Sequence, residues 1–175
     1  MAFTIQSLKW QLILIFIVSF LTLQCTKHKH ENLENEEYYY ISKVIDGDTY
    51  HIQLINNTKL KIRMEGIDAP EKGMPFYKES KQFLNKITSG KKIRFIQSSK
   101  DQYGRIIAKT YLENNQELGE EMIKNGMAWH FKKYSKDTNL ARLEISAKLN
   151  QVGIWESVNP QAPWEFRRLK KLKLK

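Results

Sequence analysis

Residues 38–65 show a strand-like pattern of apolar and polar positions. The stretch 38–45 is rich in aromatic and β-branched side chains, which favour strands. Residues 49–54 and 60–65 alternate apolar and polar side chains, so one face of each stretch is expected to be buried. Asn56-Asn57 indicates a turn between them, because asparagine tolerates positive φ. We therefore predict a meander of three strands whose inward side chains are Tyr50, Ile52, Leu54, Leu60, Ile62 and Met64.

After Pro75 the apolar pattern takes a helical period. We predict a helix that begins at Pro75, buries Phe83 and Leu84, and ends before Gly90. The elements predicted after it are strands at 91–98 and 105–112 and helices at 117–125 and 138–150. Three strands, a helix, two strands and then helices is the order of a small barrel with helical additions. The expected fold class is α+β, a five-stranded OB-fold β-barrel with about three α-helices.

The first 24 residues have the pattern of a signal peptide. Lys9 precedes an apolar run over residues 10–23, which suits a signal core and is short for a bilayer span of roughly 20 residues. Cys25 follows and resembles the lipid-modified cysteine of bacterial lipoproteins, although residues 22–24 depart from the usual small-residue box. The alternatives are an ordinary secretory signal and an uncleaved anchor. We expect an exported protein, either tethered in a bacterial cell envelope through lipidated Cys25 or secreted.

The rest of the chain divides into a polar tether (25–37), one domain (38–157) and a basic C-terminal tail (158–175). With 29 Lys and Arg against 19 Asp and Glu, the net charge of +10 suggests an anionic partner, either nucleic acid or a membrane surface. The tail has three open interpretations: contact with nucleic acid, contact with anionic lipid, and a disordered solubilising end. The single cysteine excludes an intramolecular disulfide framework and a multi-cysteine zinc site.

Three short segments concentrate carboxylates and arginines at the ends of predicted strands. They are Ile-Asp-Gly-Asp-Thr at 45–49, Arg-Met-Glu-Gly-Ile-Asp-Ala-Pro-Glu at 63–71 and Asp-Gln-Tyr-Gly-Arg at 101–105. Each segment alone has a structural explanation, since Asp-Gly is a favoured hairpin dipeptide and the others contain turn residues. The three segments together suggest a chemical site.

The side chains in these segments suit attack on a phosphodiester. Asp48 and Asp68 offer hard oxygen ligands, which suit Ca²⁺. Arg63 and Arg105 can each make bidentate hydrogen bonds to phosphate oxygens. Glu71 follows Asp68 by three residues, close enough to orient or deprotonate a water beside the metal. A metal, an arginine pair and a carboxylate are what in-line displacement at phosphorus requires.

Residues 38–157 resemble the staphylococcal nuclease (thermonuclease) family. The resemblance rests on the three segments above at the family's spacing, together with Gly126-Met127-Ala128 and Gly153-Ile154-Trp155. It implies an OB-fold barrel and Ca²⁺-dependent hydrolysis of DNA and RNA that leaves 3′-phosphate ends. It also implies nucleic acid as the substrate, with no obligate protein partner and a monomeric protein.

The resemblance further implies roles for the metal-binding positions. Asp48 and Asp68 would ligate Ca²⁺ through their carboxylates, and Ala69 would ligate it through its main-chain carbonyl. Asp46 would support the metal loop without binding the metal tightly. The family often has threonine where this chain has Ala69, and a main-chain ligand survives that change while a hydroxyl contact does not.

Catalytic and substrate-binding roles are carried over in the same way. Glu71 would be the general base, with Arg63 and Arg105 binding the phosphate and stabilising the pentacoordinate charge. The family places two tyrosines near the nucleotide. Here only Tyr134 falls into register, and Lys132 occupies the other position. Stacking on a base contributes roughly 1–3 kcal/mol, so this departure bears on substrate affinity and base preference.

Two other functions compete with this interpretation. One is a non-catalytic OB-fold module that binds nucleic acid as an envelope lipoprotein; its hallmark would be the loss of a catalytic acid or arginine, and none is missing here. The other is a surface adhesin that uses its basic face for lipid or a host polyanion, which would leave the acid and arginine segments without a purpose. The sequence alone does not decide whether three aromatic side chains pack in the core or stack on bases; they are Trp129, Phe131 and Tyr134.

Overall fold

The computed structural model describes residues 37–173. The predicted signal peptide (1–24), Cys25 and all but the last residue of the predicted tether lie outside the described residues. Within residues 37–173, no helix is both long enough and apolar enough to cross a membrane.

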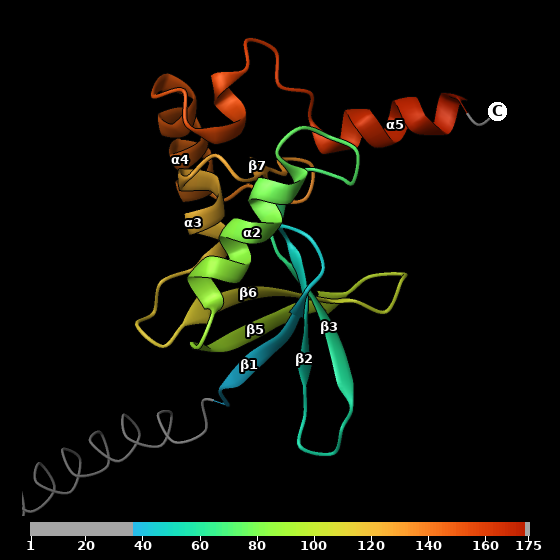
Figure 1. Cartoon of the computed structure of the whole chain (residues 1–175), viewed down its shortest axis with the longest axis vertical. Coiled ribbons are helices and arrows are strands. Elements are labelled where there is room, and N and C mark those ends of the chain that lie inside the picture. Colours follow the sequence, from blue (N-terminus) through green and yellow to red (C-terminus); the bar gives the residue numbers. More distant parts are fainter. Residues whose placement is uncertain (1–36, 174–175) are drawn as a thin grey trace, which may run out of the picture. The chain divides into compact units, whose positions relative to one another are not determined.

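Five strands close into a barrel, which confirms the predicted fold class. They are β1 (Tyr39–Val44), β2 (Thr49–Gln53), β3 (Lys59–Met64), β5 (Lys92–Lys100) and β6 (Ile106–Leu112), in the spatial order β1-β2-β3-β6-β5 (Figure 1). The first three pair antiparallel as the predicted meander, and β6 pairs antiparallel with β5. The barrel closes through parallel pairing of β3 with β6 and antiparallel pairing of β1 with β5.

The alternating residues of β2 and β3 fill the barrel. Tyr50 pairs with Ile62 across the two strands, and both side chains are completely buried. The Tyr50 hydroxyl shares a 2.8 Å hydrogen bond with the hydroxyl of Thr110, so this buried polar group is satisfied. Thr49 is buried as well, contrary to the simple alternation, because its hydroxyl donates to Asp48 at the barrel end.

Three helices follow the predicted order, with small shifts at their ends. They are α2 (Tyr77–Thr88), α3 (Leu118–Lys124) and α4 (Thr138–Leu149), and a short 3-10 helix η1 (Gly153–Glu156) comes after them. Helix α2 begins two residues after Pro75, because Phe76 at its N-cap has a left-handed backbone (φ 63°). Helix α4 begins at its predicted residue, where the Asp137 carboxylate accepts from two main-chain N–H groups.

A fourth α-helix was not predicted from the sequence. Helix α5 (Pro163–Lys173) occupies the region expected to be a basic tail, so the described residues contain four α-helices rather than about three. Pro163 stands at its start, where a missing N–H costs nothing. Trp164 and Phe166 pack against a second apolar cluster, which includes Met74, Trp129, Ala147, Ile154, Trp155 and Ala162. The cationic end of the chain is thus attached to the domain by apolar contacts.

Two very short strands connect the barrel to the helical part. β4 (Ile67–Asp68) pairs antiparallel with β7 (Trp129–His130), so that Asp68 lies opposite Trp129. The Phe131 N–H donates to the Gly66 carbonyl (2.8 Å) and extends this contact by one residue. The pairing brings the segment after β7, which carries Lys132 and Tyr134, beside the segment 63–71.

Candidate active site

The loop between β1 and β2 presents Asp48 at one end of the barrel. The Asp46 side chain accepts from the Asp48 N–H (3.1 Å), and the Asp48 carbonyl accepts from the Met64 N–H (2.8 Å). A methyl group on Gly47 would overlap the Ser80 side chain and come within 2.9 Å of the Ala69 Cβ. Glycine is therefore needed for this loop to lie against α2, and the motif 45–49 has a packing reason as well as a chemical one.

Arg63 joins the first two segments. It is the residue before the last of β3, and its Nη2 donates to Asp68 Oδ1 at 2.8 Å and lies 3.3 Å from Asp48 Oδ2. Its Nη1 donates to the carbonyls of Met64 (3.3 Å) and Ile67 (3.0 Å), which fixes the plane of the guanidinium. The structure thus brings together Asp48, Arg63 and Asp68, as predicted from separate segments.

Ala69 is held in the same place through its main chain. Its N–H donates to Asp48 Oδ2 at 2.9 Å, and its side chain is buried. The carboxylate of Asp48 is therefore satisfied on both sides, because Oδ1 accepts from the Thr49 hydroxyl at 2.7 Å. These contacts set Asp48, Asp68 and the main chain of Ala69 next to one another.

A second arginine reaches the site from α5. Arg167 Nη2 donates to Asp68 Oδ2 (2.7 Å), and its Nη1 donates to Glu71 Oε1 (2.6 Å) and to Asp68 Oδ1 (3.2 Å). It lies 99 residues along the chain from Asp68. Through Arg167, Glu71 is tied to the same cluster as Asp68. Sequence reasoning missed this residue because it treated residues 167–175 as a basic tail that contacts nucleic acid, contacts anionic lipid or is a disordered solubilising end, and none of these interpretations places an arginine at the site.

The carboxylates outnumber the arginines at this end of the barrel. Burial, and then the neighbouring charge of Asp48, raises the pKa of Asp46 to about 7. Burial also raises the pKa of Asp68, partly opposed by the Arg167 hydrogen bond and further raised by Asp48. The carboxylates of Asp48, Asp68 and Glu71 contact two guanidinium groups, and Asp46 adds a fourth carboxyl group behind Asp48. A site with surplus negative charge and oxygen donors attracts a hard cation.

The donor chemistry fits Ca²⁺ rather than a soft metal. Within residues 37–173 no group of three or more His, Cys, Asp and Glu side chains is arranged to hold a metal ion. The ligands that the family resemblance implies are the two carboxylates of Asp48 and Asp68 together with the main-chain carbonyl of Ala69, a set with only two acidic side chains. Ca²⁺ accepts such a mixed oxygen set and completes its shell of six to eight ligands with water.

Arg105 does not touch this cluster in the structure. Arg105 is the residue directly before β6. It lies two positions before Ile107, and Ile107 pairs with Arg63 across the parallel strands β6 and β3. Strand alternation then places both arginines on the same face of the sheet. The Arg105 Nε donates to Asp101 Oδ2 at 2.7 Å, and its guanidinium lies 5.7 Å from the ring centre of Tyr103. The turn 101–105 therefore positions Arg105 without bringing it to the carboxylates.

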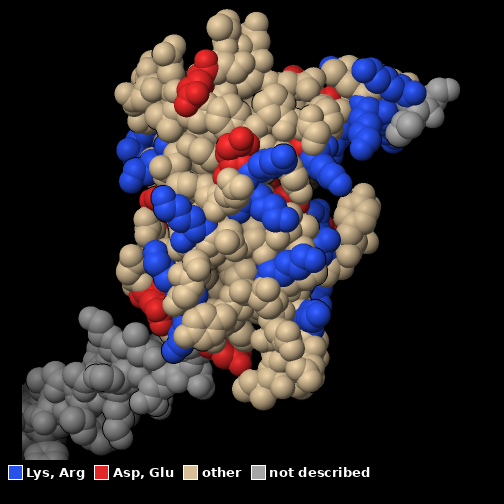
Figure 2. Space-filling model, in the orientation of Figure 1, with Lys and Arg blue, Asp and Glu red and all other residues tan. Residues whose placement is uncertain are grey.

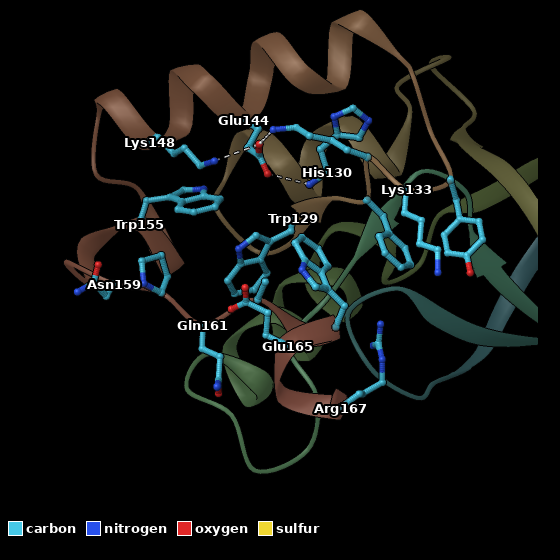
Figure 3. Close-up of a pocket in the computed structure, with 16 residues that line it drawn as sticks. Trp129, His130, Lys133, Glu144, Lys148, Trp155, Asn159, Gln161, Glu165 and Arg167 are labelled. Carbon is cyan, nitrogen blue, oxygen red and sulfur yellow. Dashed lines mark hydrogen bonds and ion pairs between the residues drawn. The ribbon is translucent and has the colours of Figure 1, made fainter. Parts of the chain in front are cut away.

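The predicted nucleotide contacts line a pocket beside the site. Lys132 and Tyr134 both border this space of about 1070 Å³, whose other walls are α4 and residues 159–167 (Figure 3). The Lys132 ammonium donates to Glu144 at 2.7 Å, whereas Tyr134 is 69% exposed and meets Phe131 edge-on. Arg167 also borders the pocket, while Asp48, Asp68 and Glu71 do not.

Comparison with known proteins assigns this barrel to a family. The family model described as staphylococcal nuclease homologue matches residues 61–157, more than half of the chain. The chain belongs to the staphylococcal nuclease family. The match includes Arg63, Asp68, Glu71 and Arg105, so these residues lie in the part of the chain that defines membership.

Individual relatives in the staphylococcal nuclease family come from plants and bacteria. A probable staphylococcal-like nuclease of Oryza sativa subsp. japonica is 46% identical over 110 residues, which is 63% of this chain and 29% of the relative. An uncharacterized endonuclease of Haemophilus influenzae is 35% identical over 77% of this chain and 75% of the relative. A micrococcal nuclease of Shigella flexneri is 30% identical over 75% of this chain and 80% of the relative.

The length covered differs between these relatives. The chain spans between 29% and 35% of the length of the plant relatives, which are much longer proteins. It spans three quarters or more of the two bacterial relatives described above. Helix α5, with Arg167, lies beyond the residues that the staphylococcal nuclease family model matches. The signal that could have revealed α5 is Pro163, a residue common at the first position of a helix, followed closely by the aromatic residues Trp164 and Phe166.

Proposed function

We propose that this protein is a Ca²⁺-dependent nuclease that hydrolyses phosphodiester bonds in DNA and RNA and leaves 3′-phosphate ends. The observation that carries the proposal is the position of Arg63, which lies within 3.3 Å of both Asp48 and Asp68 at one end of the barrel. An arginine that faces buried carboxylates at a barrel end gives a phosphate-binding group directly beside a cation site.

The residues that lie together at the barrel end each have a proposed role. Asp48, Asp68 and the Ala69 carbonyl would hold Ca²⁺, which when bound supplies Lewis-acid polarisation of a phosphoryl oxygen. Glu71 is 40% exposed at its side chain, so water can reach the carboxylate that accepts its proton. Arg63 donates to the phosphate oxygens from a guanidinium already fixed by two main-chain carbonyls.

Arg105 would supply the second phosphate contact from the neighbouring turn. Asp101 holds the Nε of Arg105, so the two terminal nitrogens are the ones that would meet a phosphate. Those are the nitrogens that a bidentate contact with phosphate can use. A shift of the turn 101–105 towards the barrel end would bring them to the substrate.

The basic surface supports nucleic acid as the substrate. Lysines and arginines gather on the described end of α5, which carries Arg167, Arg168, Lys170, Lys171 and Lys173 (Figure 2). Such a cationic helix next to the site would raise the local concentration of a polyanion. We also propose that the protein is exported, either tethered in a bacterial cell envelope through Cys25 or secreted, on the basis of the apolar run before that residue.

The test is cleavage by the purified protein with and without Ca²⁺. Single-stranded DNA, duplex DNA and RNA are incubated in Ca²⁺ and in chelator with the wild type, Glu71→Ala and the exposed control Glu113→Ala. We expect Glu71→Ala to lower turnover by ~10²–10⁴-fold, the usual share of a general base, and Glu113→Ala to leave it unchanged. Mass spectrometry of the products reads the expected 3′-phosphate ends.

Two results would contradict the proposal in different ways. Tight, salt-sensitive binding by the wild type without cleavage would make the protein a nucleic-acid-binding module. Cleavage that persists in Glu71→Ala, with folding intact, would remove Glu71 from the role of base and leave the nuclease assignment standing.

A further inference from the structure

Arg167 occupies the two groups that the proposed reaction needs free. Its guanidinium donates to both carboxylate oxygens of Asp68, the proposed metal ligand, and to Glu71, the proposed base. Asp68 is almost completely buried, so this bidentate contact is shielded from solvent on the aspartate side. A charge-assisted, bidentate pair is among the stronger hydrogen-bonded contacts in proteins.

The position of Arg167 is determined by the docking of α5. The Trp164 ring stacks on Phe131 with ring centres 5.4 Å apart and planes 2° from parallel. One ring atom of Phe166 lies 3.7 Å from where a Cβ on Gly73 would sit, in the loop that follows Glu71. The arginine that comes next is therefore delivered by a packed helix and not by a free chain end.

A cation and Arg167 cannot use Asp68 in the same way at the same time. Asp68 Oδ1 accepts from both Arg63 and Arg167, and Oδ2 accepts from Arg167. Arg63 leaves Oδ2 of Asp68 available, whereas Arg167 takes that oxygen too; a metal ion would need its lone pair, and the guanidinium charge of Arg167 repels the ion. If the metal and Arg167 exclude each other at Asp68, each weakens the binding of the other by the same factor.

We propose that Arg167 is a built-in competitor for the metal, which keeps the site closed until Ca²⁺ displaces it. In the closed state it also holds Oε1 of Glu71, so one side chain engages both the proposed metal ligand and the proposed base. Release of Arg167 from both carboxylates would leave Asp68 free to hold the metal and Glu71 free to face water. This inference rests on the proposed function, because it assigns Asp68 to the metal and Glu71 to the reaction.

The deciding measurement is Ca²⁺ affinity by isothermal titration calorimetry, with no nucleic acid present. The full chain is compared as wild type, Arg167→Gln and Arg168→Gln. Arg168 is the exposed neighbour on the same helix, so its variant removes the same unit of charge without touching Asp68 or Glu71. We expect Arg167→Gln to bind Ca²⁺ about three- to thirtyfold more tightly than wild type, since charge-assisted hydrogen bonds are lost from the metal-free state. We expect Arg168→Gln to stay within about twofold, as a change in a surface charge does.

Arg167→Lys provides a second variant that keeps both the charge and the helix. It removes the bidentate fork, and we expect its Ca²⁺ affinity to lie between those of wild type and Arg167→Gln. Circular dichroism melts of all variants establish that each is folded. Equal Ca²⁺ affinity for wild type and Arg167→Gln, or weaker binding by the variant, would overturn the inference, as would the absence of Ca²⁺ binding in both.

Failure of this inference and failure of the proposed function give different results. If Arg167→Gln binds Ca²⁺ more tightly but the protein cuts no nucleic acid, the competition at Asp68 is supported and the proposed nuclease function is wrong. Unchanged affinity in a protein that cuts nucleic acid with Ca²⁺ keeps the nuclease and overturns the competition. Where both hold, the Ca²⁺ concentration that gives half-maximal cleavage falls in Arg167→Gln by the factor seen in calorimetry.

Discussion

Asp68 and Glu144 are both buried carboxylates held by two cations, yet only one of them belongs to the candidate active site. The Asp68 side chain is 1% exposed and contacts Arg63 and Arg167. The Glu144 side chain is 2% exposed and contacts Lys132 and Lys148. Burial and ion pairing alone therefore do not separate a reactive carboxylate from a structural one.

The separation comes from the local balance of charge. Glu144 is one carboxylate between two ammonium groups, and its Oε1 also accepts the His130 main-chain N–H at 3.1 Å (Figure 3). Burial alone would raise the pKa of Glu144, but the hydrogen bonds from Lys132 and Lys148 outweigh it and hold the pKa below its ordinary value. Burial raises the pKa of Asp68 as well, but here the hydrogen bond from Arg167 opposes it only in part and the neighbouring charge of Asp48 raises the pKa further, so it stays above its ordinary value. The surplus of negative charge marks the site that seeks a cation.

The sharpest test of this comparison replaces each of the two carboxylates by its amide, in the variants Asp68→Asn and Glu144→Gln. We expect Asp68→Asn to lower the rate of cleavage per folded molecule by about 10²–10³-fold, as loss of a preorganised charged group does. We expect Glu144→Gln to keep that rate within about threefold, because the hydrogen-bond partners of Glu144 are His130, Lys132 and Lys148 and include no member of the Asp48, Arg63 and Asp68 cluster. Rates are measured with saturating Ca²⁺ and corrected for the folded fraction.

The opposite pattern would break the comparison. If Glu144→Gln abolished cleavage while still folded, the Lys132–Glu144–Lys148 cluster would belong to the site. If Asp68→Asn cleaved normally, surplus charge at the barrel end would have no bearing on the reaction, and Asp68 would be as structural as Glu144.

The same pair of carboxylates should differ in its effect on stability and on pH. We expect Glu144→Gln to lower the free energy of unfolding at pH 7 by about 1–3 kcal/mol, because charged hydrogen bonds to a buried group are lost. The pKa of Glu144 is lower in the folded protein than in the unfolded chain. Ionised Glu144 therefore contributes fully to the free energy of unfolding above its unfolded pKa, and this contribution is lost as the pH falls through its folded pKa. The deficit of Glu144→Gln should therefore shrink below pH 4.

Urea unfolding at pH 7, 5 and 3.5 measures this deficit, with the exposed Glu113→Gln as the matched control. A deficit that stays constant down to pH 3.5 would show that packing, rather than the ion pairs, makes Glu144 stabilising. The control should stay within about 0.5 kcal/mol of wild type throughout, as surface substitutions usually do.

The barrel and most of the site follow from local patterns in the sequence. The alternation around Tyr50 and Ile62 predicts strands with one buried face, and both residues are buried on that face. The segments 45–49 and 63–71 lie at strand ends, and strand ends of a small barrel meet. The pairing of β3 with β6 and of β4 with β7 could not be predicted, because pairing of distant strands depends on the whole packed chain.

The contribution of α5 could not be predicted for a different reason. Its cations satisfy the ordinary criterion for a solvated tail, and the apolar anchors are only Trp164 and Phe166. Whether two aromatic residues bury themselves depends on a complementary surface, here Phe131 and the loop at Gly73, which forms only in the folded domain. Arg167 reaches Asp68 as a consequence of that docking.

Lys132 and Tyr134, the two predicted nucleotide contacts, give the smallest expected effects. Sequence register places both near the nucleotide, but the Lys132 ammonium is held by Glu144 while Tyr134 is 69% exposed beside the pocket. We expect Tyr134→Ala to raise KM for single-stranded DNA by roughly five- to a hundredfold with little change in kcat, because a stacking surface of about 1–3 kcal/mol is lost.

We expect Lys132→Gln to change KM by less than about threefold and to lower the free energy of unfolding by about 0.2–1 kcal/mol, as a half-exposed ion pair does. Steady-state kinetics and urea unfolding of the two variants decide between these roles. A larger effect of Lys132→Gln on KM would place Lys132 on the substrate and would make Glu144 its positioning partner rather than a purely structural carboxylate.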